Sequence, residues 1–169
     1  MTSPNVDLRH ALDRGGRDPD ATAGTRAPQL GDVVSCYFPL DEDPNRPGIK
    51  PRPCLVLGSR RSTASGRWYV QLAYGTKQNL EHIRPGELAL RDRTSHRAAG
   101  LHHPTKFVFR RIRSVPFIFA YFRADHGGRV ILGSLLPEDL QRAERLCAAF
   151  QRRGVQPSPV RPTPAARYE

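Results

Sequence analysis

Arg52 stands between two prolines, Pro51 and Pro53, where a polar loop passes into the apolar run of residues 54–57. Because a proline fixes its own φ angle and steers the preceding residue toward an extended backbone, Arg52 has little backbone freedom. A guanidinium held in this way presents a fork of donors that matches two oxygens of a phosphate. The pattern indicates an anion-binding residue, and a loop that merely ends at a strand is the plainer alternative.

A second polar cluster follows the apolar strand pattern of residues 67–75. The next four residues supply a hydroxyl, an ammonium group and two amides: Thr76, Lys77, Gln78 and Asn79. If the two apolar segments pair as antiparallel strands, the start of one and the end of the other lie at the same edge of a sheet. We therefore expect Arg52 and Thr76 to be neighbours, although an ordinary polar turn would also explain the cluster.

The chain is strongly basic, with 27 lysines and arginines against 16 acidic residues and a net charge of +11. Residues 91–113 concentrate this charge, since they hold seven basic residues and one acid, Asp92. Three histidines lie in the same stretch: His96, His102 and His103. A folded region of this charge favours a polyanion or an acidic protein as its partner.

The elements that must position these residues are short strands followed by one helix. Strand patterns occur at residues 32–38, 54–59, 67–75, 86–90, 105–112, 116–122 and 129–135, with a hairpin turn expected at 125–128. Residues 137–153 predict an amphipathic helix, with Pro137 at its first position and Gly154 as its C-terminal cap. We expect a mainly β fold, a small and strongly curved antiparallel sheet or barrel with a C-terminal α-helix.

Composition sets the expected boundaries and location. Residues 1–29 predict a disordered leader and the proline-rich residues 153–169 a disordered tail, which leaves residues 30–152 as one domain. The three cysteines show no metal-ligand spacing and are expected to be reduced core residues: Cys36, Cys54 and Cys147. No apolar run could span a bilayer and the first residues do not resemble a signal peptide, so we expect a cytoplasmic protein.

Several short motifs occur in an order that resembles the PemK/MazF-type toxins of bacterial toxin–antitoxin systems. Those proteins begin with Gly-Asp-Val, pass through a glycine-containing loop into Arg-Pro and an aliphatic strand, and reach a later strand that ends in threonine. The matching positions are Gly31-Asp32-Val33, Gly48, Arg52-Pro53 with residues 55–57, and Thr76. Residues 100–109 and the final helix also fit, so the resemblance covers about residues 30–151.

The resemblance implies an SH3-like barrel of the CcdB/PemK-like kind, acting as an endoribonuclease without a metal or other cofactor. In such enzymes the ribose 2′-hydroxyl attacks the adjacent phosphate of single-stranded RNA, which leaves a cyclic phosphate and a 5′-hydroxyl. Arg52 would stabilise the charge that grows on the phosphate, and Thr76 would hydrogen-bond the same group. Further RNA contacts are expected from Lys50, Lys77, Gln78, Lys106 and Arg110.

The resemblance also implies a homodimer that is neutralised by an acidic antitoxin. The general base stays open among seven residues: Asp41, Glu42, Asp43, His82, His96, His102 and His103. Two other functions remain alternatives. One is a barrel that binds nucleic acid or protein without cutting it, and the other is a toxin of the same superfold that poisons DNA gyrase through its C-terminal residues.

Overall fold

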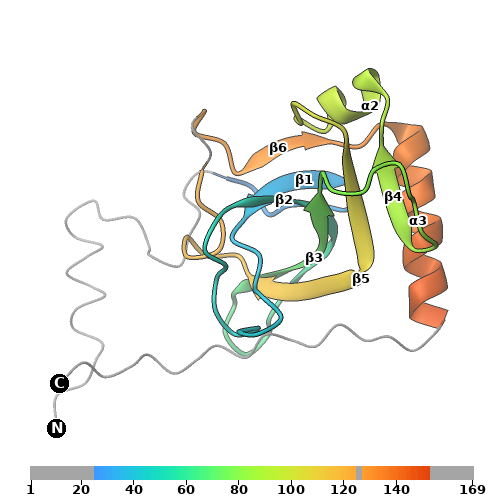
Figure 1. Ribbon diagram of the computed structural model, residues 1–169. Helices are drawn as coiled ribbons and strands as arrows, with labels where there is room; N and C mark the ends of the chain where they lie inside the picture. Colours follow the sequence, from blue (N-terminus) through green and yellow to red (C-terminus); the bar gives the residue numbers. More distant parts are fainter. Residues whose placement is uncertain (1–24, 125–126, 153–169) are drawn as a thin grey trace, which may run out of the picture.

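The computed structural model describes residues 25–124 and 127–152, which form a six-stranded antiparallel sheet with two helices (Figure 1). The elements in chain order are β1 (Asp32–Cys36), β2 (Arg52–Arg61), β3 (Trp68–Thr76), β4 (Glu87–Leu90), α2 (Arg93–Ala98), β5 (Thr105–Pro116), β6 (Ile131–Ser134) and α3 (Pro137–Arg152). The strands are ordered β4-β5-β3-β2-β1-β6, and each neighbouring pair is antiparallel. β4 and β6 remain edge strands, so the sheet is open. The predicted mainly β fold with a C-terminal helix is confirmed.

Both faces of the sheet are buried, because successive residues of its central strands alternate between two apolar clusters. One cluster contains aromatic residues of segment 117–122 and, from the strands, Val34, Val56 and Leu72. The other cluster contains residues of α3 and, from the strands, Val33, Leu55 and Ala73. Burial on both sides explains why the sequence of β2 is apolar without interruption at residues 54–57.

The long strand β5 bends where three of its residues have no partner in β3. Ala73 pairs with Ile112, and the next residue, Tyr74, pairs with Val108, so residues 109–111 are extra on the β5 side. Extra residues in one strand kink it and increase its twist. As a result β5 lies beside β4 along its first half and changes direction along its second half (Figure 1).

Two elements differ from the expectation. The strand predicted at 116–122 is wrong: β5 continues to Pro116, and residues 117–121 turn, with the Tyr121 and Phe122 amides donating to the Ile118 carbonyl. The aromatic side chains of this segment fill the core, while its backbone does not pair in the sheet.

The short helix α2 was not expected, although Asp92 caps it by accepting hydrogen bonds from the Thr94 and Ser95 amides. The hairpin turn predicted at 125–128 includes residues 125 and 126, which lie outside the described residues.

The helix α3 begins at Pro137 as predicted and is described as far as Arg152; its predicted cap, Gly154, lies outside the described residues. Residues of its apolar stripe pack against β4 and β5, among them Leu140, Ala143 and Leu146. Neither α2 nor α3 has both the length and the apolar character that crossing a lipid bilayer requires.

The carboxylate of Asp32 joins the start of the sheet to the residues that precede it. It accepts two hydrogen bonds from the Arg26 guanidinium, at 2.7 and 3.1 Å, one from the Gln29 amide at 2.8 Å and one from the Ser134 hydroxyl at 2.7 Å. Burial alone would raise the pKa of Asp32, but these donors and the Arg26 charge hold it below its ordinary value. Among the described residues these contacts include Arg26 and Gln29, which precede the boundary predicted at residue 30; residues 1–24 and 153–169 lie outside the described ranges.

Replacing Asp32 by asparagine should lower the free energy of unfolding by about 1–3 kcal/mol at neutral pH, because an amide cannot accept four hydrogen bonds. The pKa of Asp32 is lowered on folding, so its contribution is complete above the ordinary carboxyl range and is lost as the pH falls through the lowered pKa. Urea denaturation at pH 7 and at pH 3 should show the difference between wild type and Asp32→Asn shrinking on acidification. Asp43→Asn, which changes an exposed carboxylate, should leave the stability within about 0.5 kcal/mol of wild type.

Candidate functional site

The pairing of β2 with β3 brings Arg52 and Thr76 to the same end of the sheet. Cys54 lies opposite Tyr74 in this antiparallel register, so two further residues along each strand place Arg52 opposite Thr76. The backbones are very close here, since a Cβ at Gly75 would lie 2.1 Å from the Pro53 carbonyl oxygen. The two residues nevertheless line different hollows of the surface, one on either side of the end of β3.

The first hollow, which we call the Arg52 pocket, has a volume of about 440 Å³. Three cationic residues and two histidines line it: Arg52, Lys77, Arg129, His102 and His103. The rest of the lining is Ser35, Pro51, Pro53, Gly100, Leu101, Thr105, Gly127 and Leu132. This lining contains no carboxylate among the described residues, so the pocket concentrates positive charge and favours an anion.

Within residues 25–124 and 127–152, the Arg52 guanidinium makes no hydrogen bond or ion pair. Its backbone is held on both sides, because it lies between two prolines and opposite Cys36 of β1. Arg52 is also half-buried, so its charge is partly shielded from water. A partly shielded guanidinium on a restrained backbone, unpaired within the described residues, is suited to bind an anion.

His102 and His103 reach the Arg52 pocket from the loop between α2 and β5. Gly100, at φ +71°, brings this loop against β6, where a Cβ would lie 2.0 Å from the Leu132 carbonyl oxygen. Both histidines are exposed, and the Thr105 hydroxyl donates to the His103 carbonyl at 3.1 Å. An imidazole can give or take a proton near neutral pH, so this loop adds candidate acid and base groups to the pocket.

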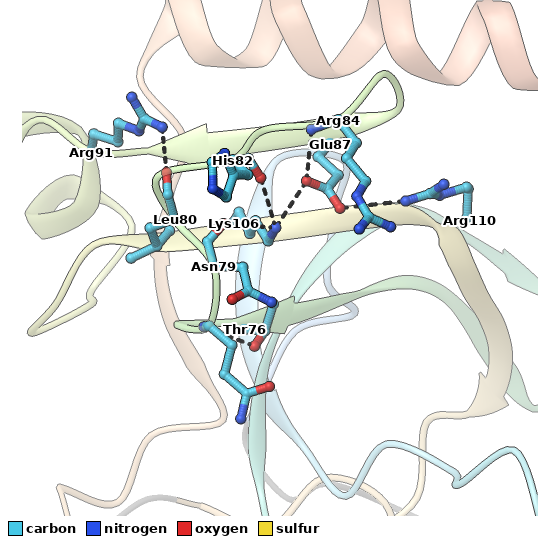
Figure 2. Close-up of polar contacts among 10 residues, drawn as sticks. Thr76, Asn79, Leu80, His82, Arg84, Glu87, Arg91, Lys106 and Arg110 are labelled. Atoms are coloured by element: carbon cyan, nitrogen blue, oxygen red, sulfur yellow. Dashed lines mark hydrogen bonds and ion pairs between the residues drawn. The ribbon is translucent and has the colours of Figure 1, made fainter.

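The second hollow, which we call the Thr76 groove, has a volume of about 890 Å³. Its lining is Tyr74, Thr76, Gln78, Asn79, His82, Arg84, Glu87, Lys106, Val108 and Arg111. The Thr76 hydroxyl accepts a hydrogen bond from the Gln78 amide at 3.2 Å and so stabilises the turn after β3 (Figure 2). Lys77, the residue after Thr76, lines the Arg52 pocket instead.

Lys106 is buried and bonded inside the protein, with 6% of its surface exposed. Its ammonium group donates to Glu87 at 3.0 Å and to the carbonyls of Asn79 and His82 at 3.1 and 3.3 Å (Figure 2). An ammonium group has three donors, so none remains for a phosphate in this arrangement. Lys106 thus fastens the loop after β3 to β5, and we leave it out of the proposed RNA contacts.

The Glu87 carboxylate faces three cationic or polar donors at once. Burial alone would raise the pKa of Glu87. Hydrogen bonds from the Arg84 amide and Lys106, with the charges of Lys106 and Arg110, hold the pKa below its ordinary value. Arg110 lies 3.5 Å from the second carboxylate oxygen, and half of its side chain is exposed (Figure 2).

The residues predicted for the site are therefore divided. Arg52 and Lys77 share the Arg52 pocket, whereas Thr76, Gln78 and Lys106 line the Thr76 groove. Arg110 and the exposed Lys50 line neither hollow.

Of the seven candidate bases, only His102 and His103 line the Arg52 pocket. The ring of His96 is buried and lies 3.0 Å from the Leu101 carbonyl oxygen. Nothing in the sequence indicated that Arg129 and Ser35 line the pocket. Their positions depend on β1 pairing with β2 on one side and with β6 on the other, and no local sequence pattern signals the pairing with β6. Among the described residues there is no group of three or more histidine, cysteine or acidic side chains arranged to hold a metal ion.

Replacing Lys106 by methionine should lower the free energy of unfolding by about 3–5 kcal/mol, because Glu87 would be left buried without its closest cation. The double variant Lys106→Met/Glu87→Gln should recover part of this loss, since it removes the uncompensated charge. Urea denaturation measures both values, and Lys50→Met, at an exposed lysine, is the matched control. A loss below about 1 kcal/mol for Lys106→Met would contradict the structural role of this pair.

Comparison with known proteins does not assign the chain to a family: no family model matches it, and no curated protein matches it either.

Proposed function

We propose that this chain is an endoribonuclease that cleaves single-stranded RNA in the Arg52 pocket. The observation that carries the proposal is the position of Arg52, which lines a pocket with Lys77, Arg129 and two histidines. Within the described residues the Arg52 guanidinium makes no hydrogen bond or ion pair, and the pocket lining holds no carboxylate. Cations of this kind bind a phosphodiester, and imidazoles near it can move the protons that its cleavage requires.

The reaction needs an internal nucleophile, which RNA carries as its 2′-hydroxyl. The 2′-oxygen forms a bond to the adjacent phosphorus while the bond from phosphorus to the 5′-oxygen of the next nucleotide breaks. One histidine of the pair His102 and His103 takes the proton of the 2′-hydroxyl, and the other gives a proton to the leaving 5′-oxygen. Arg52 and Lys77 stabilise the charge that develops on the phosphate. In this proposal Lys77 takes the phosphate contact first expected of Thr76.

The order of motifs from Gly31 to Thr76, which resembles the PemK/MazF-type toxins, supports the same activity. We therefore propose a toxin with an SH3-like barrel, cytoplasmic and homodimeric, that an acidic antitoxin neutralises. The packing of α2 supports a sheet that curls toward a barrel, because α2 contacts both β4 and β6, the two edge strands. A Cβ at Gly133 of β6 would lie 2.3 Å from the Ala98 carbonyl oxygen of α2. The net charge of +11 suits both RNA and an acidic protein partner.

Cleavage by the purified protein in the presence of EDTA should yield fragments with 2′,3′-cyclic phosphate ends. Arg52→Ala should lower kcat by about 10²–10³, the usual effect of removing one donor to a developing oxyanion. Arg60→Ala is the matched control, because Arg60 lies on the same strand over the Tyr69 ring and outside the pocket. Mass spectrometry of the fragments and circular dichroism of each variant give the readouts.

Two outcomes, one from that assay and one from a DNA-supercoiling assay with gyrase, would favour the alternative functions over the nuclease. RNA that is retained on the protein but stays intact would indicate a binding module. Inhibition of DNA supercoiling that survives Arg52→Ala would indicate a gyrase poison.

The two histidines should be distinguished by the pH dependence of cleavage. Wild type should give a bell-shaped profile of kcat/KM, and His102→Ala and His103→Ala should each lower the rate by about 10²–10⁴ and remove one limb. His82→Ala, which changes a histidine of the Thr76 groove, should keep both limbs. Unchanged profiles in both pocket variants would show that neither histidine moves a proton.

A further inference from the structure

A carboxylate bridges two arginines on the far side of β3 from the Arg52 pocket. Asp41, in the loop between β1 and β2, lies 3.4 Å from the Arg111 guanidinium and 2.9 Å from that of Arg113. Both arginines belong to β5, at and just after its bend. Their Nε atoms are buried, and neither has a hydrogen-bond partner among the residues that the structure describes. The single negative charge of Asp41 does not balance the two positive charges, and both guanidinium groups keep hydrogen-bond donors that no described residue accepts.

The two arginines are held independently of Asp41. The Arg111 guanidinium lies over the Tyr74 ring, 4.2 Å from its centroid, and Arg113 donates to the Ile112 carbonyl at 3.0 Å. Their side chains are 34% and 23% exposed, whereas that of Asp41 is 60% exposed. The cations are therefore the fixed part of this cluster, and the carboxylate is the part that a competing anion can displace.

We propose that Arg111 and Arg113 form a phosphate-binding subsite that Asp41 occupies in the free protein and that a phosphodiester of single-stranded RNA fills by displacing this carboxylate. A phosphodiester matches the carboxylate in charge and in presenting two oxygens to a guanidinium fork. The inference rests on the proposed RNA-cleaving function and extends it to neighbouring nucleotides of the substrate. Arg111 also lines the Thr76 groove, in which Thr76 is the chain neighbour of Lys77 in the Arg52 pocket.

The test is binding of a 2′-O-methyl oligoribonucleotide, which the proposed reaction cannot cleave, to full-length variants. Asp41→Asn should tighten binding about two- to five-fold, because it removes the competing carboxylate. The matched control is Asp43→Asn, which makes the same charge change in the same loop at a carboxylate that lies 3.7 Å from Arg46. Adding Arg111→Gln and Arg113→Gln should abolish the gain from Asp41→Asn.

Equal tightening by Asp41→Asn and Asp43→Asn would overturn the subsite, since net charge alone would then explain the effect. A gain that survives the two arginine substitutions would also overturn it. Binding of a polyglutamate chain that rises in Asp41→Asn, with no rise for the oligonucleotide, would assign the arginines to an acidic protein instead of RNA.

A second readout separates this inference from the proposed function. Inorganic pyrophosphate should raise the melting temperature of Asp41→Asn more than that of wild type or Asp43→Asn, whether or not the protein cuts RNA. If pyrophosphate has this effect but wild type neither binds nor cleaves RNA, the anion site stands and the nuclease proposal fails. If RNA is cleaved and pyrophosphate acts equally on all three proteins, the nuclease stands and the subsite fails.

Discussion

The close approach of two backbones, at the start of β2 and the end of β3, is the constraint on which the candidate site depends. A side chain at Gly75 would collide with the Pro53 carbonyl oxygen and come within 3.1 Å of the Phe107 ring. Because Pro53 follows Arg52 and Gly75 precedes Thr76, this contact fixes where both polar residues leave the sheet. Within the described residues Arg52 is thus held through its main chain, and its guanidinium has no hydrogen-bond or ion-pair partner.

Much of the fold could be predicted because its signals are local. Apolar and β-branched runs located β1, β2, β3 and β4, and the stripe behind Pro137 located α3. The segment from Phe117 to Phe122 was misread because a buried turn and a buried strand can have the same aromatic composition. The helix α2 was overlooked because it is short and polar, although Asp92 gave a capping signal.

The candidate site was predictable only where it follows from neighbouring strands. Pairing of consecutive strands was enough to bring Arg52 near Thr76, but it did not show that Lys77, and not Thr76, lines the same pocket as Arg52. The position of Arg129 depends on β6 lying beside β1, a pairing between residues about a hundred positions apart. Lys106 appeared to be a surface cation because its burial depends on Glu87 of a different strand.

The ammonium group of Lys106 is buried and fully hydrogen-bonded, so the lysines of this chain differ in their reactivity toward amine reagents. The sequence has only three, and Lys50 and Lys77 are exposed while Lys106 is enclosed by two carbonyls and a carboxylate. Acylation requires a free amine with a lone pair, which a buried, triply hydrogen-bonded ammonium does not offer. Of the three lysines, amine-directed reagents should therefore modify Lys50 and Lys77 in the folded protein, and modification of Lys106 reports that the loop after β3 has opened.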